Sequence, residues 1–540
     1  MSSKSLFVQS VIYLSLPFLI FCIGFLHWYW ASVLVVSFVW SCWAIVQSLE
    51  SVLDLKRISL KQMMLCASVS FFCCFILGIG GFWSQSYDWF VKNPLLNDLT
   101  LSEWPLIIDF SNATLEVKSL CGEGRAGFVY YLFFYLPAAT IGKVFGSLSV
   151  ARFSIFLWAV YGLSLVLMWL LRLVSRPNSW RNTLFAVLLF VCWGGFDIIG
   201  QILRIIYLWY QNCHHIMPTS LIDGWCSPYF TYYASHFTSI FWSFNQCIPL
   251  WLITIVIFSF FDLRVIGFLY SFSLLYSPWG AIGLLPILLF GIVGKLNQIG
   301  LKNIFQMISM SNVGFPLMIC VIVGSYYFSN NTSLQEKGFF WNFISVGEFL
   351  VKYILFILVE LGIFIWLMRN RIHQDALLAG SLLTLLLIPF YKMTAPNDFL
   401  MRASIPALFV IFVSWLVWCV EHDLAACSAG RDGVCEKMPA RLCSYRQREN
   451  LQVGMLSEGS EERSALGTHA GGKGCRLLVA PHENGAVGET GGSTHLEMGI
   501  GRETALRGTL GCLHQLAVLH GKFVHFVHRN AACQLVISHA

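Results

Sequence analysis

The chain has 540 residues, of which 57% are hydrophobic and only 11% are charged, and its formal net charge is +6. An ordinary soluble domain carries about 25% charged residues, so this composition excludes a water-soluble globular protein. The surplus positive charge is spread over short turns and the C-terminal region, which indicates a membrane-topology signal and not a nucleic-acid footprint. We therefore expect a bilayer around the protein and no nucleic-acid partner.

Long apolar runs recur along roughly the first 425 residues. Runs of about 18 or more apolar residues are long enough to cross about 30 Å of hydrocarbon. Their hydrophobicity is continuous and does not alternate, which predicts helices and not the strands of a barrel. We predict an all-α, polytopic transmembrane bundle of about 12 spans in residues 1–425, with juxtamembrane helices on an outer loop. The expected spans are Val8–Leu26, Ala31–Leu49, Met63–Trp83, Phe153–Leu171, Thr183–Ile199, Pro249–Phe261, Val265–Tyr276, Trp279–Val293, Val313–Phe328, Phe349–Met368, Ala376–Phe390 and Ala403–Val420.

The positions of Lys and Arg predict the orientation, because positive residues in short loops stay in the cytoplasm. The basic positions that fall on one side include Lys4, Arg57, Arg172, Arg264, Lys295, Arg369 and Arg371. This scheme requires that the apolar stretch Val129–Phe145 does not cross, so we expect a re-entrant or juxtamembrane helix there. Three segments then face outward: Ser86–Arg125, the aromatic-rich Arg204–Ile248, and Tyr391–Arg402.

The character of the sequence changes after about Val420. Most of the 14 histidines follow that point, Gly and Arg become frequent, and no tryptophan occurs. The remaining apolar residues are irregularly spaced, so they do not predict a packed core. We predict that residues 426–540 form a disordered or weakly ordered cytoplasmic tail.

Candidate catalytic residues follow the third expected span. Asp88 and Asp98 would lie at the outer lip of the membrane, where a carboxylate can accept a proton from a hydroxyl or hold a divalent cation. Lys92 could pair with a phosphate in this partly desolvated place. The competing interpretation is that Asp88 ends a helix in the headgroup layer while Asp98 faces water.

Asp197 and Glu360 are ionisable residues within expected spans. Such groups are costly in hydrocarbon and usually face a cavity or a partner. Asp197 is therefore a candidate substrate-binding residue. For Glu360, a structural hydrogen bond between helices is an equally good explanation.

Asp398 and Arg402 lie four residues apart at the mouth of the last expected span, so on a helix they share a face. The planar guanidinium group can grip a phosphate through two donors at once. A local ion pair that anchors the helix is the competing interpretation. His214, His215 and His236 could be metal ligands or a catalytic base, but adjacent histidines without a regular carboxylate partner are a weak signal for either. No cofactor is assigned from the sequence, and a divalent cation stays a candidate.

Several short motifs resemble those of the GT-C superfamily of membrane glycosyltransferases. The resemblance rests on aspartates directly after an early span, followed by Tyr130–Ala139 and Gly142–Lys143. The runs Gly195–Gly200, Phe241–Gln246, Ser277–Gly280 and Asn397–Pro406 are similar to bacterial multi-pass membrane proteins of that general type. The resemblance covers residues 60–420 and implies a catalytic Asp88, Asp98 as the second acidic position, and a polyprenyl-phosphate sugar as donor. The chain departs from the common layout in placing a two-helix hairpin before the span that leads to the loop.

The leading hypothesis is a glycosyltransferase of the bacterial cytoplasmic membrane that moves a sugar from a polyprenyl phosphate to an extracytoplasmic acceptor. Asp88 would act as the base or support a metal, Lys92 and Arg402 would hold the phosphate, and Asp98 and Asp398 would orient them. The expected partners are the lipid-linked sugar donor and the membrane lipids. The alternatives are a transporter or flippase for a lipid or polysaccharide precursor, working through Asp197 and Glu360, and a polysaccharide polymerase or ligase.

Overall fold

The computed structural model describes residues 1–49, 57–86, 88–109, 111, 124–174, 180–210, 223, 225–226, 232–329, 336–394 and 397–429. The α-helices are α1 (Ser3–Phe25), α2 (Trp28–Leu49), α3 (Leu60–Ile76), α4 (Trp89–Leu101), α6 (Leu136–Val144), α7 (Leu148–Val174), α8 (Trp180–Cys192), α9 (Asp197–Tyr210), α10 (His236–Ser259), α11 (Ile266–Tyr276), α12 (Pro278–Ile299), α13 (Phe315–Phe328), α14 (Val346–Ile357), α15 (Ile363–Ile372), α16 (Ala376–Leu387) and α17 (Asp398–Ala429). Short 3-10 or π-helical turns are η1 (Ile79–Gly81), η2 (Phe133–Tyr135), η4 (Leu301–Met307), η5 (Met310–Gly314), η6 (Phe340–Asn342), η7 (Leu358–Gly362) and η8 (Ile388–Phe390). The strands β1 (Ile107–Asp109) and β2 (Arg125–Gly127) form one antiparallel pair, and β3 (Lys337–Phe339) and β4 (Tyr391–Met393) form another.

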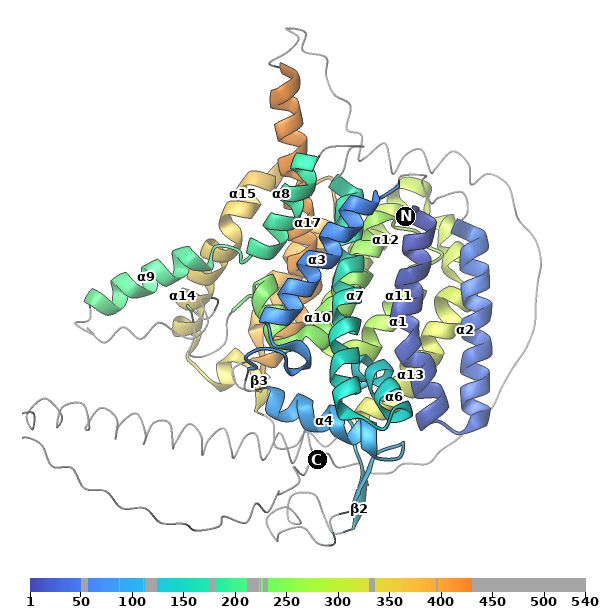
Figure 1. Cartoon of the computed structure of the whole chain (residues 1–540). Helices are drawn as coiled ribbons and strands as arrows, with labels where there is room; N and C mark the ends of the chain where they lie inside the picture. The colour runs from blue at the N-terminus through green and yellow to red at the C-terminus, as the bar shows by residue number, and fades with distance from the viewer. Residues whose placement is uncertain are drawn as a thin grey trace, which may run out of the picture.

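The fold is an all-α bundle of membrane-spanning helices, as the apolar runs predict (Figure 1). Within the described ranges, nine helices are long and apolar enough to cross a membrane. Three shorter apolar helices, α3, α11 and α16, coincide with three further expected spans. The chain is thus a multi-pass membrane protein, and the total of twelve crossings stays a prediction.

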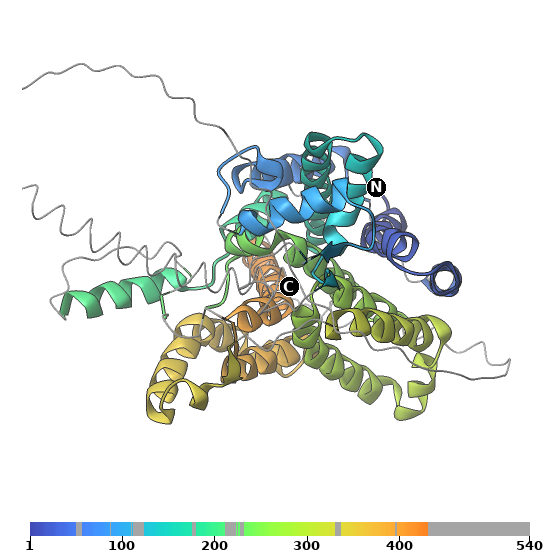
Figure 2. The ribbon, with the colours of Figure 1, turned by 90° about the horizontal axis from the view of Figure 1, so that it is seen from below.

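The most deeply packed helices are α7, α10 and α17, whereas α2 and the α14–α15 pair lie at the periphery and expose many apolar side chains. Apolar exposure of this kind is expected where helices face lipid. Figure 2 shows α2 on one flank of the bundle and α14 and α15 on another. The centre of the bundle is therefore built from helices that lie far apart in the sequence.

The basic turns gather at the end of the bundle that holds the N-terminus. Ser2 forms a β-bridge with Arg57, and the Arg172 Nε donates to the Ser3 Oγ at 2.8 Å. Arg371 forms an ion pair with Glu421 at the same end (Figure 1). The positive-inside rule predicts that this end, which we call the cytoplasmic end, faces the cytoplasm and that the opposite end faces outward.

Helix α4 and the two strand pairs lie at the opposite end, which we call the outer end (Figures 1 and 2). Helix α6, within the stretch Val129–Phe145, has 9 residues. At about 1.5 Å per residue it is too short to cross the hydrocarbon, in agreement with the expected juxtamembrane helix. The outer end therefore carries short elements laid across the bundle.

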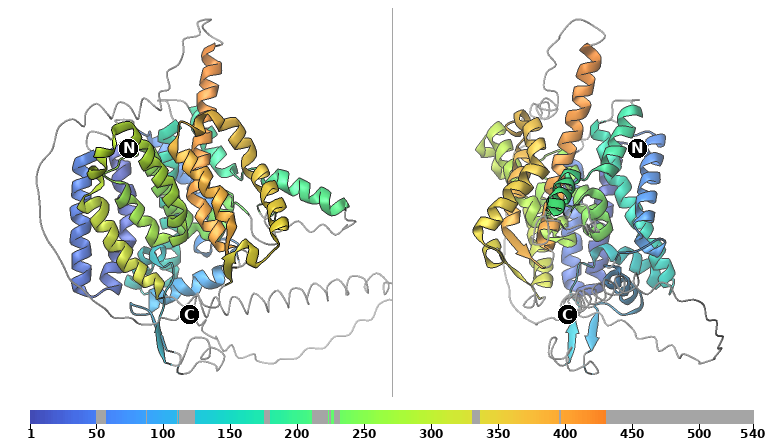
Figure 3. Two further views of the ribbon diagram at one scale, coloured as in Figure 1. Left: turned by 180° about the vertical axis from the view of Figure 1, so that it is seen from behind. Right: turned by 90° about the vertical axis from the view of Figure 1, so that its left-hand side faces the viewer.

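Two boundaries differ from the expected ones. The span expected from Pro249 begins earlier, because α10 starts at His236 and continues past a kink at Ser243. Helix α17 extends to Ala429 and protrudes beyond its neighbours at the cytoplasmic end (Figure 3), so the expected boundary at residue 425 falls inside this helix. The remainder of the predicted tail, residues 430–540, lies outside the described residues.

Glycines allow several helices to approach closely, as is common at helix interfaces in membranes. A Cβ atom added at Gly283 on α12 would lie 1.8 Å from the Ala403 carbonyl oxygen on α17. A Cβ atom at Gly162 on α7 would lie 2.1 Å from the Tyr13 hydroxyl on α1. The Gly283 contact is next to Arg402, so it also helps to position a candidate site residue.

We predict that Gly283→Ala lowers the thermal stability of the detergent-solubilised protein, because the added methyl group forces α12 and α17 apart. Overpacking of this kind typically costs about 1–3 kcal/mol. Gly324→Ala on α13 is the matched control, since its added Cβ would meet no atom within 4 Å. Thermal unfolding of both variants checks the contact, and equal unfolding temperatures would show that α12 and α17 do not pack as described.

Candidate functional site

Asp88 and Lys92 form the first half of a charged cluster at the outer end. Asp88 immediately precedes α4, and the Lys92 Nζ lies 3.6 Å from its Oδ2. The Lys92 side chain is only 4% exposed, whereas that of Asp88 is 39% exposed. The carboxylate thus lies at the mouth of the cluster, and the ammonium group lies beneath it.

The buried Lys92 ammonium group is anchored in the bundle. Its Nζ donates to the Trp242 carbonyl oxygen at 2.6 Å, beside the kink that α10 makes at Ser243. The same atom lies 5.5 Å from the Trp89 ring centre and 5.4 Å from that of Phe244, at cation–π distances. These contacts fasten α4 to α10.

Desolvation favours the neutral forms of both Asp88 and Lys92. Desolvation raises the pKa of Asp88, and the nearby Lys92 opposes that rise. Desolvation lowers the pKa of Lys92, and Asp88 opposes that fall. A carboxylate whose pKa is raised is a stronger base than an ordinary aspartate, which suits proton abstraction near neutral pH.

Asp398 and Arg402 form the second half of the cluster, in the first turns of α17. The Arg402 Nη1 lies 2.8 Å from the Asp398 Oδ2. The buried Asn397 side chain fixes the start of this helix, because its Oδ1 accepts from the backbone amides of Leu400 and Met393 at 3.2 and 3.3 Å. Strand β4 also contacts α17, which further fixes the start of this helix.

The two halves come together although about 300 residues separate them in the sequence. Asp88 interacts electrostatically with both Asp398 and Arg402, and Lys92 also interacts with Arg402. We call Asp88, Lys92, Asp398 and Arg402 the outer charge cluster. It contains two acids and two bases, so its formal charges balance.

Two tyrosines complete the surroundings of the cluster. The Arg402 guanidinium lies 5.8 Å from the Tyr131 ring centre. Tyr232 packs with Met401, and its hydroxyl interacts electrostatically with Asp398, Arg402 and Asp88. The sequence analysis placed Tyr131 only in a motif and Tyr232 only in an aromatic-rich outward segment, because neither residue carries a local signal for this contact.

Arg402 has an unused donor. Among the described residues, its buried Nε has no hydrogen-bond acceptor. An unpaired buried donor is costly, and on a cation it favours binding of an anion. Asp398 takes only part of the donor capacity of the guanidinium group, so the remainder is available to an oxyanion such as a phosphate.

The structure does not bring Asp98 to the outer charge cluster. Asp98 lies ten residues after Asp88 on α4, which corresponds to about 15 Å along a helix. Its carboxylate accepts from the Asn97 Nδ2 at 3.4 Å. The geometry therefore gives no support to the expected role of Asp98 in orienting the phosphate-binding groups, and that role stays a prediction.

Asp197 also lies apart from the cluster. It begins α9 in a candidate span and is paired with Glu360 on the π-helical turn η7.

Of the three histidines considered for metal binding, His236 is buried among aromatic rings, and its Nδ1 is 3.0 Å from the Phe190 carbonyl oxygen. The other two, His214 and His215, fall outside the described residues. The described part of the chain contains no group of three or more His, Cys, Asp or Glu residues that could hold a metal ion.

Comparisons with known proteins provide no relative for this chain. No protein-family model, no curated protein and no solved structure matches it. What the site can do must therefore be argued from its geometry.

Asp98 gives a pH-dependent prediction. Burial raises its pKa to about 6, so the folded protein holds this proton more tightly than the unfolded chain. Stability should therefore fall as pH rises from about 4 to about 6 and stay reduced above that range. Asp98→Asn should remove this penalty and raise the unfolding temperature at neutral pH, with little effect near pH ~4.

Thermal scans in detergent across this pH range provide the measurement. Glu336→Gln is the control, because the Glu336 side chain is 57% exposed and should leave the pH profile in place. An unchanged pH profile in Asp98→Asn would show that Asp98 is not buried in this way.

Proposed function

We propose that the chain is a membrane glycosyltransferase that moves a sugar from a polyprenyl-phosphate donor to an acceptor at the outer face of the membrane. The proposal rests on one observation: Asp88 lies close enough to Arg402 for their charges to interact, and the Arg402 Nε has no acceptor among the described residues. Sugar transfer from a lipid phosphate needs a base for the acceptor hydroxyl and a cation for the leaving phosphate. The GT-C resemblance of the same segments supports this assignment.

In the proposed reaction, the Asp88 carboxylate accepts the proton of the acceptor hydroxyl as its oxygen bonds to the anomeric carbon of the sugar. The bond between that carbon and the phosphate oxygen breaks, and the electron pair leaves with the lipid phosphate. Arg402 neutralises the growing phosphate charge, and its ion pair with Asp398 holds the guanidinium in place. Atoms and charge balance, and the base returns to its carboxylate form by losing the proton to water.

Lys92 has a positioning role in this scheme. Because it is almost fully buried and donates to the Trp242 carbonyl oxygen, it is poorly placed to contact a phosphate directly. Its charge instead keeps Asp88 ionised at the cluster mouth, since an adjacent cation favours the carboxylate form.

An apolar cavity at the outer end is suited to the isoprenoid chain of the donor. It has a volume of about 500 Å³ and lies between the end of α1, α13 and the β1–β2 pair. Phe21, Phe128, Ile322 and Tyr326 are among its lining residues. The Tyr326 hydroxyl contacts the backbone of Tyr130, whose neighbour Tyr131 lies beneath Arg402. A lipid chain in this cavity would thus lie near the proposed phosphate site.

Transport of a lipid or polysaccharide precursor is the second candidate function. The pairing of Asp197 with Glu360 within candidate spans favours it, because acids at membrane depth often belong to ion or proton pathways. Reconstituted vesicles separate the two functions, since a transporter moves the intact lipid-linked sugar across the bilayer and a transferase consumes it. A polymerase or ligase would differ from both in its acceptor.

We predict that Asp88→Asn lowers sugar transfer by about 100-fold or more while the protein remains inserted, because a general base contributes about 10²–10⁴-fold. The assay follows transfer from a panel of polyprenyl-phosphate sugars by the purified protein. Asp98→Asn is the matched control on the same helix and should retain activity. Full activity of Asp88→Asn with any donor that the parent chain uses would exclude Asp88 as the base.

A further inference from the structure

The carboxyl groups of Asp197 and Glu360 interact with each other, each within a candidate membrane span and apart from the outer charge cluster. Each residue is only 3% exposed. Asp197 begins α9, and Glu360 is the middle residue of η7, a π-helical turn between α14 and α15. π-Helical turns of this kind are frequent at functional sites. The contact therefore joins two helical segments that are distant in sequence.

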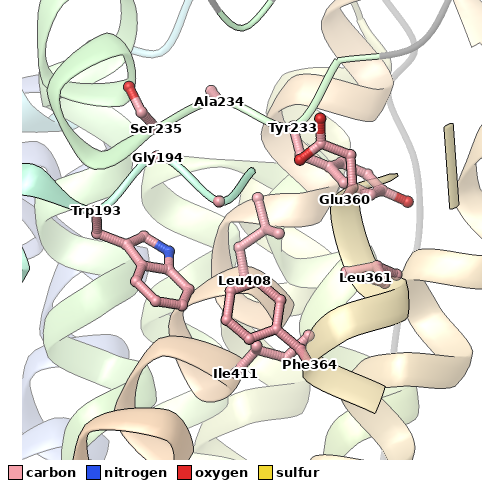
Figure 4. Close-up of a pocket in the computed structure, with 11 residues that line it drawn as sticks. Trp193, Gly194, Tyr233, Ala234, Ser235, Glu360, Leu361, Phe364, Leu408 and Ile411 are labelled. Atoms are coloured by element: carbon pink, nitrogen blue, oxygen red, sulfur yellow. The ribbon is translucent and has the colours of Figure 1, made fainter. Parts of the chain in front are cut away.

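Local sequence features bring the two acids together. Gly195 has a φ of +64°, and a Cβ atom at this position would lie 3.0 Å from the Glu360 Oε2. A Cβ atom at Gly200 would lie 2.1 Å from the Trp225 ring, so this glycine makes room for the indole. The Trp225 Nε1 then donates to the Glu360 Oε1 at 2.6 Å. Glu360 lies beside Tyr233 in Figure 4 and lines a small cavity of about 20 Å³, with room for about one water molecule.

The hydrogen-bond inventory of the pair is incomplete without a proton. Glu360 accepts from Trp225 and from the Phe196 backbone amide. Both carboxylate oxygens of Asp197 are buried without a donor among the described residues. Two ionised carboxylates offer acceptors only, whereas a protonated one supplies a donor. One proton on Asp197, donated to Glu360, would give one Asp197 oxygen a partner and turn a contact between two acceptors into a hydrogen bond.

The electrostatic surroundings act in the same direction. Asp223 interacts with both acids, and its Oδ2 accepts from the Ser235 backbone amide at 2.8 Å. The other titratable groups nearby are the tyrosines Tyr233, which interacts with Glu360, and Tyr353, which interacts with Tyr233. If Asp197 were ionised as well as Glu360, its negative charge would lie near both Glu360 and Asp223 in a low-dielectric environment, which is unfavourable.

We propose that Asp197 and Glu360 form a proton-binding site within the membrane, in which Asp197 carries the proton and Glu360 the negative charge. The bound proton links α9 to the η7 turn. Loss of the proton would place two like charges in contact and weaken that link. This site is independent of the outer charge cluster and of the proposed sugar transfer.

Infrared spectroscopy of the full chain in lipid nanodiscs tests the proposal, because a protonated carboxyl group has a carbonyl stretch distinct from that of a carboxylate. The parent protein should show such a band at neutral pH, and Asp197→Asn should lose it. Glu336→Gln, which alters an exposed acid, should retain it. An identical band in the parent chain and in Asp197→Asn at neutral pH would overturn the proposal.

A second measurement keeps the test decisive if Asp197→Asn does not fold. This measurement uses a double variant, Asp88→Asn with Asp98→Asn, produced with ¹³C-carboxyl aspartate. The double variant lacks the two outer acids whose pKa is raised. A protonated-carboxyl band that shifts with the ¹³C label at neutral pH supports a proton on Asp197. Absence of any shifted band contradicts it.

Discussion

The buried positive charge of Lys92 is the interaction on which the outer end of the protein depends. A lone ammonium group in a low-dielectric interior is very costly, so it must be matched by acceptors. The Trp242 carbonyl oxygen and the Asp88 carboxylate provide that match, and they do so from two different parts of the chain. Because Trp242 lies at the kink of α10 and Asp88 at the start of α4, the charge fixes α4 across the end of the bundle.

The same requirement explains the other charged groups in the bundle. Asp398 matches Arg402 at the outer end, whereas Asp197 and Glu360, within candidate spans, need a proton to be matched. The three pairs differ in what they leave unsatisfied. Lys92 is well anchored, Arg402 keeps a buried Nε without an acceptor among the described residues, and both Asp197 oxygens lack a donor among those residues. The first gap suits an anion and the second suits a proton.

Much of the fold was predictable from the sequence, because the free energy of transfer into lipid is a local property of each apolar run. The all-α membrane bundle is confirmed, and the juxtamembrane position of Val129–Phe145 agrees with the short helix α6. The grouping of Asp88 with Arg402 followed less directly, from the rule that basic turns stay inside.

Contacts such as that of Lys92 with the Trp242 carbonyl oxygen had no sequence signal, because every residue has a backbone carbonyl group. The pairing of Asp197 with Glu360 was equally hidden, because each acid signalled only that it needs a partner. The separation of Asp98 from Asp88 was not predictable either, because the sequence indicated outward exposure for a whole segment and did not show that α4 spaces the two carboxylates.

Arg402 in the outer charge cluster is the proposed binding group for the phosphate of a lipid, and the affinity of the purified protein for a polyprenyl phosphate tests this role. Arg402→Gln should weaken binding at least tenfold relative to the parent chain, because a charged hydrogen bond to phosphate contributes about 1.5–3 kcal/mol. Arg371→Gln, which alters an ion-paired arginine at the cytoplasmic end, should bind as the parent does, and the matching polyprenol without phosphate should not distinguish the three proteins. Equal affinity of the parent and Arg402→Gln for the polyprenyl phosphate would contradict the account.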